Sequence, residues 1–150
     1  PMARFRFGLQ AVLDHRELIE GQKQKVVAGF ESQRVRLERV LRECQRSIAA
    51  EKAGQRTMLG SADIHGARQQ AAAALRLMVA AQRTAVELAG VHKRLEGARA
   101  ALLEAAKRRK AVELLRERRL DEWKQDMNRR EVAAVDELAV MRAARKEESL

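Results

Sequence analysis

The sequence predicts an all-α protein, a long two-helix antiparallel coiled-coil hairpin whose second helix is longer and overhangs the first. Good helix formers dominate the chain, and charged residues make up 35% of it, a composition typical of long helices. Only four of the 150 residues are aromatic, too few for an ordinary globular core, because large rings usually supply much of its apolar area. The single proline stands at position 1, so no proline interrupts the helices.

We expect the first helix at about residues 8–53. From Leu9 onward one register advances by alternating steps of three and four, which keeps one side of a helix toward a partner helix. The register passes through Leu9, Val12, Arg16, Ile19, Lys23, Val26, Phe30, Gln33, Leu37, Val40 and Cys44. Four further apolar residues widen this stripe on one side: Leu13, Val27, Leu41 and Ile48.

The pattern fails at residues 54–66, where Gly54, Gly60 and Gly66 follow one another at six-residue spacing. Ser61 and Asp63 are residue types that cap the N-terminus of a helix. Glycines together with caps indicate a loop and a helix restart. We therefore expect a loop at about residues 54–62.

We expect the second helix at about residues 62–147. It opens with a seam of mostly small residues, which allow close approach of the first helix: Ile64, Ala67, Ala71, Ala74, Met78, Ala81, Ala85 and Leu88. At 1.5 Å per residue the two helices are roughly 70 Å and roughly 125 Å long. Leu9 then lies opposite about residue 106, and the residues after about 112 have no partner helix within the chain. Their apolar side chains indicate an external partner or self-association.

We expect a single coiled-coil domain over residues 1–150 that is not an enzyme. His15, His65 and His92 do not cluster, and neither a metal-ligand spacing nor a glycine-rich phosphate loop occurs,. A hairpin of two helices also encloses no cleft. No catalytic residue, cofactor or metal is therefore expected. The lone Cys44 fits a reducing compartment, and no apolar run approaches the ~20 residues that span a bilayer, so we expect a cytoplasmic protein.

The net charge of +10 allows an acidic protein or nucleic acid as partner. Residues 107–130 hold ten basic residues but also five acidic ones, and Asn128 is the only asparagine there. Interleaved signs are more typical of the solvated faces of a long helix, and no nucleic acid is expected. A basic nucleic-acid-binding coiled coil and a generic scaffolding or homodimeric coiled coil remain the alternatives.

Two segments carry a family resemblance. Residues 5–17, FRFGLQAVLDHRE, are similar to the FxFxLQxxLxxR opening of the FliJ family of flagellar type III export proteins. Residues 110–119, KAVELLRERR, resemble the KAxExLxxRR segment of that family, and Trp123, Arg129-Arg130-Glu131 and residues 135–139, VDELA, follow as in its RRE…xDExA ending. Gly8 departs from the pattern, because many relatives have a basic residue there. The resemblance covers essentially the whole chain.

The resemblance implies an antiparallel coiled coil similar to the central stalk of rotary ATPases. Such proteins are thought to insert into the hexameric export ATPase, FliI, and promote its assembly. They contact the cytoplasmic part of the membrane export gate, FlhA, and escort export chaperones, so the chain would reach the membrane only through partners. The implied ATPase-facing tip comprises Phe5, Phe7, Val112, Leu115, Arg119 and Trp123. The implied gate face comprises Ala71, Leu75, Met78 and Gln82, although Ala71 and Met78 also fit the seam.

Overall fold

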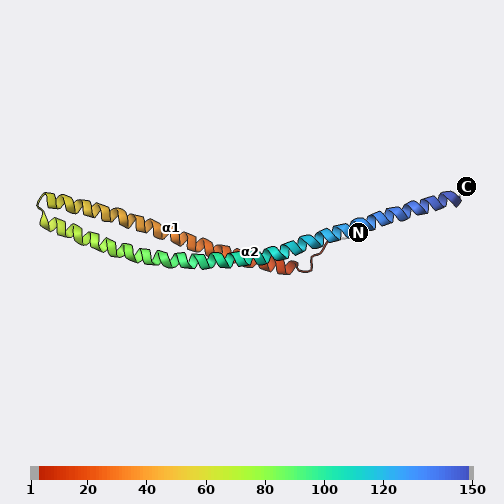
Figure 1. Ribbon diagram of the computed structural model, residues 1–150, viewed down its shortest axis with the longest axis horizontal. Coiled ribbons are helices and arrows are strands. Elements are labelled where there is room, and N and C mark those ends of the chain that lie inside the picture. The colour runs from red at the N-terminus through yellow and green to blue at the C-terminus, as the bar shows by residue number, and fades with distance from the viewer. Residues whose placement is uncertain (1–3, 149–150) are drawn as a thin grey trace. The chain divides into compact units, whose positions relative to one another are not determined.

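The computed structural model describes residues 4–148, and the side chains of residues 4–147. It contains two helices, α1 (Gln10–Gly60) and α2 (Ile64–Glu148). They form an antiparallel hairpin (Figure 1) with the second helix longer, and no strand occurs among the residues described. The all-α hairpin predicted from composition and periodicity is confirmed.

Contacts within the chain separate it into two compact units, each built from part of α1 and part of α2. One unit, called the terminal unit here, comprises Pro1–Glu20 and Ala105–Leu150. The other, called the turn unit, comprises Gly21–Glu104. The single coiled-coil domain over residues 1–150 stays a prediction.

The first helix was expected to end near residue 53, and this boundary is wrong, because α1 continues through Gly54 to Gly60. A Cβ atom at Gly54 would lie 3.0 Å from the Gln70 side-chain oxygen on α2. The space beside Gly54 is thus filled by the end of the flexible Gln70 side chain. Packing against α2 offsets the about 1 kcal/mol that glycine costs in a helix interior.

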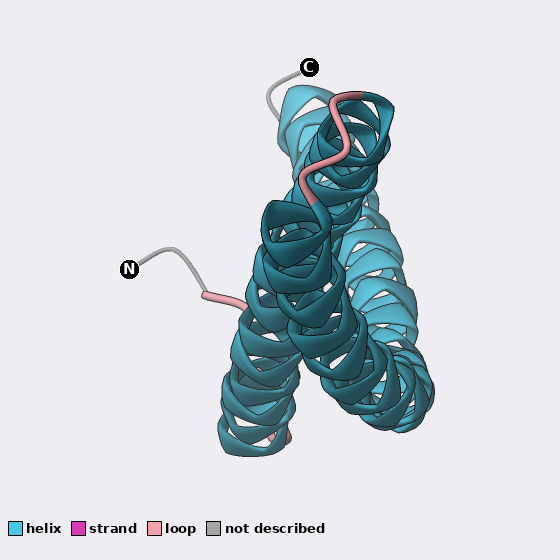
Figure 2. Ribbon diagram, turned by 90° about the vertical axis from the view of Figure 1, so that its left-hand side faces the viewer, coloured by secondary structure: helices cyan, strands magenta, loops and turns pink. Residues whose placement is uncertain are grey.

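The connection is only Ser61–Asp63, drawn in pink at the end that faces the viewer in Figure 2. The Ala62 amide donates to the Leu59 carbonyl at 3.1 Å, and the Asp63 amide donates to the Met58 carbonyl at 2.8 Å. With Ala62 left-handed at φ 62°, this is the Schellman arrangement that satisfies the last carbonyls of a helix.

Asp63 also starts the second helix. Its Oδ1 accepts a hydrogen bond from the Gly66 amide at 2.9 Å, as an N-cap does. The predicted cap is therefore confirmed at Asp63. It is wrong at Ser61, whose hydroxyl instead donates to the Met58 carbonyl of α1 at 3.0 Å.

The seam of α1 follows the predicted register at some positions and lies one residue later at others. Leu37 is buried and Ile19, Phe30 and Cys44 are half-buried, as the register predicted, whereas Val12, Val26 and Val40 are exposed. In place of these valines the seam uses residues that widened the predicted stripe: Leu13, which is buried, and Val27 and Leu41, which are half-buried. The helix was therefore assigned correctly, and the register was wrong at these valines.

The seam of α2 follows the prediction at most of its positions. Ala67 and Ala74 are buried, and Ala71, Met78, Ala81 and Leu88 are half-buried. Two seam predictions are wrong, because Ile64 and Ala85 are exposed. Beyond Leu88 the seam continues through the buried Val91 and Leu95.

The pairing between the helices differs from the expected one, because the turn falls later in the chain. In the turn unit Glu31 pairs with Arg99, and in the terminal unit Glu20 pairs with Arg109. Two predictions are therefore wrong: that Leu9 lies opposite residue 106, and that the residues after about 112 have no partner helix within the chain. Intramolecular contacts in the terminal unit reach Trp123, and side chains are uniformly exposed over residues 128–147.

Candidate partner-binding surfaces

An aromatic cluster in the terminal unit joins the segment before α1 to α2. The rings of Phe5 and Trp123 have their centroids 6.0 Å apart at 56°, a tilted geometry favoured by aromatic pairs. Phe7 is buried, and the guanidinium carbon of Arg119 lies 6.0 Å from the centre of its ring. Four of the six residues predicted for the tip therefore lie in these two contacts.

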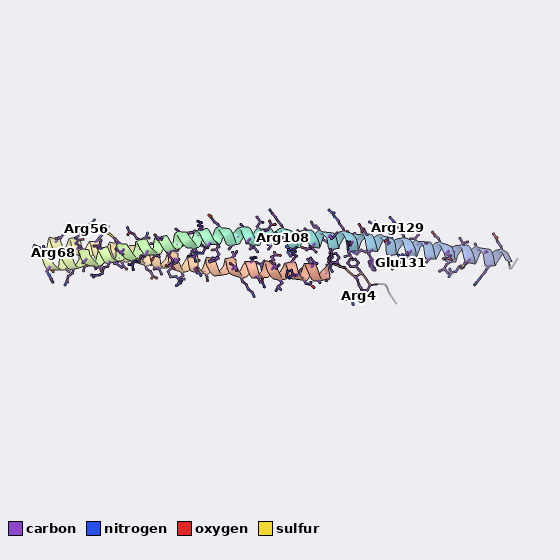
Figure 3. All side chains as sticks on the ribbon, turned by 90° about the horizontal axis from the view of Figure 1, so that it is seen from below. Arg4, Arg56, Arg68, Arg108, Arg129 and Glu131 are labelled. Carbon is purple, nitrogen blue, oxygen red and sulfur yellow. The ribbon has the colours of Figure 1, made fainter. Side chains whose placement is uncertain are left out.

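Arginines surround this cluster. A hollow of about 400 Å³ is lined by Arg4, Phe5, Arg6, Phe7, Gln10 and Arg116. Arg4, labelled in Figure 3, and Arg6 and Arg116 are all exposed. The hollow thus combines apolar rings with cations, which suits an apolar side chain flanked by carboxylates.

The remaining two predicted tip residues, Val112 and Leu115, are half-buried on α2 in the same unit. Their apolar surface is therefore only partly free for a partner. Four lining residues of the hollow were not singled out from the sequence: Arg4, Arg6, Gln10 and Arg116. The position of the turn would have identified them, because a turn placed at 61–63 brings the segment before α1 opposite residues 116–123.

Arg109 occupies a seam position where an apolar residue was expected. It pairs with Glu20 on α1 and with Glu113 on α2. The hydrogen bond to Glu20, opposed by desolvation and assisted by weaker attraction from Glu113, raises the pKa of Arg109 above its ordinary value. The pair joins the two helices within the terminal unit and removes part of the charge of the basic run.

The residues predicted for the gate face do not share one exposed side of α2. Leu75 and Gln82 are exposed, whereas Ala71 and Met78 are half-buried. Two exposed valines, Val79 and Val86, were not singled out from the sequence. Their spacing from Leu75 predicts that all three residues share one side of the helix, because residues four and eleven apart lie on the same side.

Glu31 is the most connected carboxylate of the turn unit. It accepts hydrogen bonds from Arg34 of α1 at 2.9 Å and from Arg99 of α2. The hydrogen bond from Arg34, assisted by that from Arg99 and opposed by desolvation, lowers the pKa of Glu31 below its ordinary value of 4.5. Glu38 pairs with Arg34 as well, at 2.8 Å.

Within the described range no group of three or more histidine, cysteine, aspartate or glutamate side chains is arranged to hold a metal ion. Over the same residues, no stretch of helix combines the length and apolarity needed to cross a membrane. Cys44 is a free, half-buried thiol. The surfaces described above are therefore the candidate sites of the molecule.

Comparison with known proteins decides the family. The family model described as Flagellar FliJ protein matches residues 5–148, nearly the whole chain. The chain belongs to the FliJ family. The resemblance seen in the FRFGLQAVLDHRE and KAVELLRERR segments is thereby confirmed. Searches of curated proteins and of solved structures found no match.

Membership of the FliJ family makes the chain a component of flagellar type III export, in a family whose role is not catalytic. It places the chain with the export apparatus.

Proposed function

We propose that this FliJ-family chain binds the export ATPase ring as a stalk and promotes assembly of the ring. The proposed binding surface is the aromatic cluster of the terminal unit, Phe5, Phe7 and Trp123, with the arginines around it. The observation that carries the proposal is the contact of Phe5 with Trp123 beside exposed Arg116 and Arg119. Tryptophan and arginine are the residue types that most often dominate binding energy at interfaces. Intramolecular packing fixes the rings before binding, which lowers the entropy lost on association.

The chain itself carries out no chemistry in this role. The chain activates the ATPase by favouring the assembled ring, since a ligand that binds one state more tightly raises the population of that state. The binding residues would be Phe5, Phe7, Val112, Leu115, Arg119 and Trp123, with Arg4, Arg6 and Arg116 around them. The cytoplasm is the proposed location, at the membrane export apparatus and through partners only.

The test measures turnover of the cognate FliI-like ATPase with and without the chain. We expect stimulation by the wild-type chain, and an about tenfold higher concentration for half-maximal stimulation with Trp123→Ala or Arg116→Glu. Arg142→Glu is the matched control, because this arginine is exposed on α2 away from the aromatic contacts, and it should leave maximal stimulation unchanged. Absence of binding and of stimulation would refute the proposal.

Contact with an FlhA-like export gate and escort of export chaperones complete the proposed function. Leu75 and Gln82, exposed on α2, support an outward binding surface in the turn unit, whereas Ala71 and Met78 are only partly available. Leu75→Ala is expected to weaken binding of the gate cytoplasmic region without changing ATPase stimulation. Equal loss of both activities would contradict separate surfaces.

Nucleic-acid binding is not favoured by the ion pairs of the basic run. Arg109 pairs with Glu20 and Glu113, and Lys110 approaches Glu113 at 3.8 Å. These internal pairs leave fewer cations to neutralise phosphates. Tight, strongly salt-dependent binding of duplex DNA would restore this alternative.

A further inference from the structure

One side of α2 in the turn unit exposes three large apolar residues at helical spacing. Leu75 is 62% exposed, Val79 45% and Val86 74%. Together with Gln82 they stand at i, i+4, i+7 and i+11, positions that share one side of a helix. We call these four residues the outward stripe. Large apolar residues that recur along one exposed side, rather than singly, indicate a binding surface.

The outward stripe is not flat. One hollow of about 300 Å³ is lined by Leu75, Arg76, Val79, Ala80 and Arg83. A second of about 400 Å³ is lined by Val79, Gln82, Arg83, Val86 and Glu87. Val79 and Arg83 line both hollows, so these follow one another along α2. Two successive hollows at helical spacing suit the side chains of a second helix.

Small residues border the stripe. Ala72, Ala80, Ala85 and Ala89 are all exposed on this part of α2. Alanine leaves room for the backbone of another helix to approach. The surface therefore favours a helix rather than a bulky loop.

The charge beside the stripe is mostly positive, and Glu87 is the only acidic residue among those that line the two hollows. No acidic residue occurs between Asp63 and Glu87, whereas Arg68, Arg76 and Arg83 do. These arginines are exposed, and Arg68 lies near the turn end in Figure 3. None of the three takes part in an ion pair within residues 4–148. Unpaired cations beside an apolar stripe are complementary to carboxylates.

We propose that the outward stripe binds one amphipathic helix of another protein, whose apolar side covers Leu75, Val79 and Val86 and whose carboxylates meet Arg76 and Arg83. The inference rests on the proposed gate and chaperone contacts, and it deepens them by naming the chemistry of the segment that is bound. It also moves the anchors of the surface from Ala71 and Met78 to Val79 and Val86.

A second copy of the chain fits the same surface poorly. Two outward stripes packed together would bring arginines toward arginines, with Glu87 as the only acid near either stripe. Like charges across an interface are unfavourable. The partner helix is therefore acidic, and it comes from another protein.

The first experiment uses the full chain in cells that make the export apparatus. The photo-crosslinking residue p-benzoylphenylalanine replaces Val79 or Val86, or Val35 of α1 as the matched control. The exposed fraction of Val35, 43%, is similar to the 45% of Val79. Val35 also lies beside two arginines, Arg36 and Arg39. We expect crosslinks from positions 79 and 86, but not 35, to a segment that mass spectrometry shows to be amphipathic and acidic.

The second experiment measures affinity of the full chain for that segment as a labelled synthetic peptide, by fluorescence anisotropy. Val86→Glu, and the pair Arg76→Glu with Arg83→Glu, should each weaken binding by about tenfold or more. Exchanging the carboxylates of the peptide for lysines should restore binding to the double variant. Val35→Glu should have no effect.

Several outcomes would overturn the inference. They are equal crosslinking from Val35, crosslinks to a second copy of the chain, a captured segment without carboxylates, or a peptide affinity unchanged in the arginine variants. ATPase stimulation is measured on the same variants. Wild-type stimulation with no crosslink removes this inference alone, whereas crosslinks without any stimulation remove the proposed stalk role alone.

Discussion

Phe5, Phe7 and Trp123 are three of the four aromatic residues of the chain, and all three lie in the terminal unit. Phe5 and Phe7 lie in the segment before α1, where no helical seam can pack against α2. A ring contact outside the seam provides apolar area that a few alanines and valines do not. The aromatic contacts thus hold the segment before α1 on α2.

Removing either phenylalanine should release this segment and expose Trp123. Phe5→Ala and Phe7→Ala are expected to shift tryptophan emission to longer wavelength and to increase quenching by acrylamide, since an aromatic contact contributes about 1 kcal/mol beyond its buried area. Trp123 is the single tryptophan, so its emission reports this contact without labelling. Phe30→Ala is the control, because Phe30 lies in the turn unit near Arg94. An equal shift with Phe30→Ala would contradict a local contact.

Glu31 gives the turn unit a defined dependence on pH. Hydrogen bonds from Arg34 and Arg99 lower its pKa in the folded chain below 4.5, so the unfolded chain binds the proton more tightly. The stabilisation from Glu31 is therefore present above about pH 4.5 and is lost as the pH falls through the lowered pKa.

The corresponding prediction compares Glu31→Gln with the wild type by thermal unfolding, followed by circular dichroism. At pH 7 the variant should melt lower by roughly 1–4 °C, because partly exposed ion pairs contribute little. The difference in melting temperature should shrink as the pH falls through the lowered pKa of Glu31. Glu43→Gln serves as control, since Glu43 is exposed on the same helix. A difference that does not shrink on acidification would show that Glu31 stabilises by packing rather than by charge.

At the scale of the elements, periodicity predicted both helices, and glycine content misplaced the turn. Gly54 is a poor helix residue in isolation, but here it lies inside α1, beside the Gln70 side chain of α2. Packing against a second helix thus overrides a local propensity. The shifted positions in the seam of α1 have a similar cause, because Val12 and Leu13, or Val26 and Val27, fit a helical stripe equally well until a partner helix packs against one of them.

The turn predicts a stabilising substitution. Ala62 is left-handed, a conformation that costs a residue with a side chain roughly 1–2 kcal/mol. Glycine at this position would avoid that cost, but part of the gain is offset by the greater backbone entropy of glycine in the unfolded chain. Ala62→Gly should therefore raise the free energy of unfolding by about 0.5–1 kcal/mol. Asp63→Ala should lower it by about 1 kcal/mol, because the Gly66 amide loses its cap. Urea unfolding measures both, and a destabilised Ala62→Gly variant would contradict the Schellman turn.

At the scale of the molecule, the fold class and the FliJ family followed from the sequence, and the binding surfaces followed only in part. Trp123 and Arg119 were found through the resemblance, but Arg4 and Arg116 depend on how the two helices are paired. That pairing is set by a turn of three residues, and an error of a few residues at the turn shifts every residue across the seam. Val79 and Val86 were missed because the rotation of α2 about its axis was not fixed by its alanine-rich sequence.

The net charge of +10 is a property of the whole chain, and it predicts how association depends on salt. If the proposed partner ring is acidic where it receives the chain, charge attraction speeds encounter, and raising salt from about 20 to about 150 mM should lower the association rate constant by about tenfold. The dissociation rate should change little, because it depends on the packed contacts. Arg142→Glu together with Arg145→Glu lowers the net charge by four and should slow association alone, whereas Trp123→Ala should speed dissociation. Stopped-flow binding separates the two rates. If the double variant changes only dissociation, the charge acts through specific contacts instead of steering the encounter.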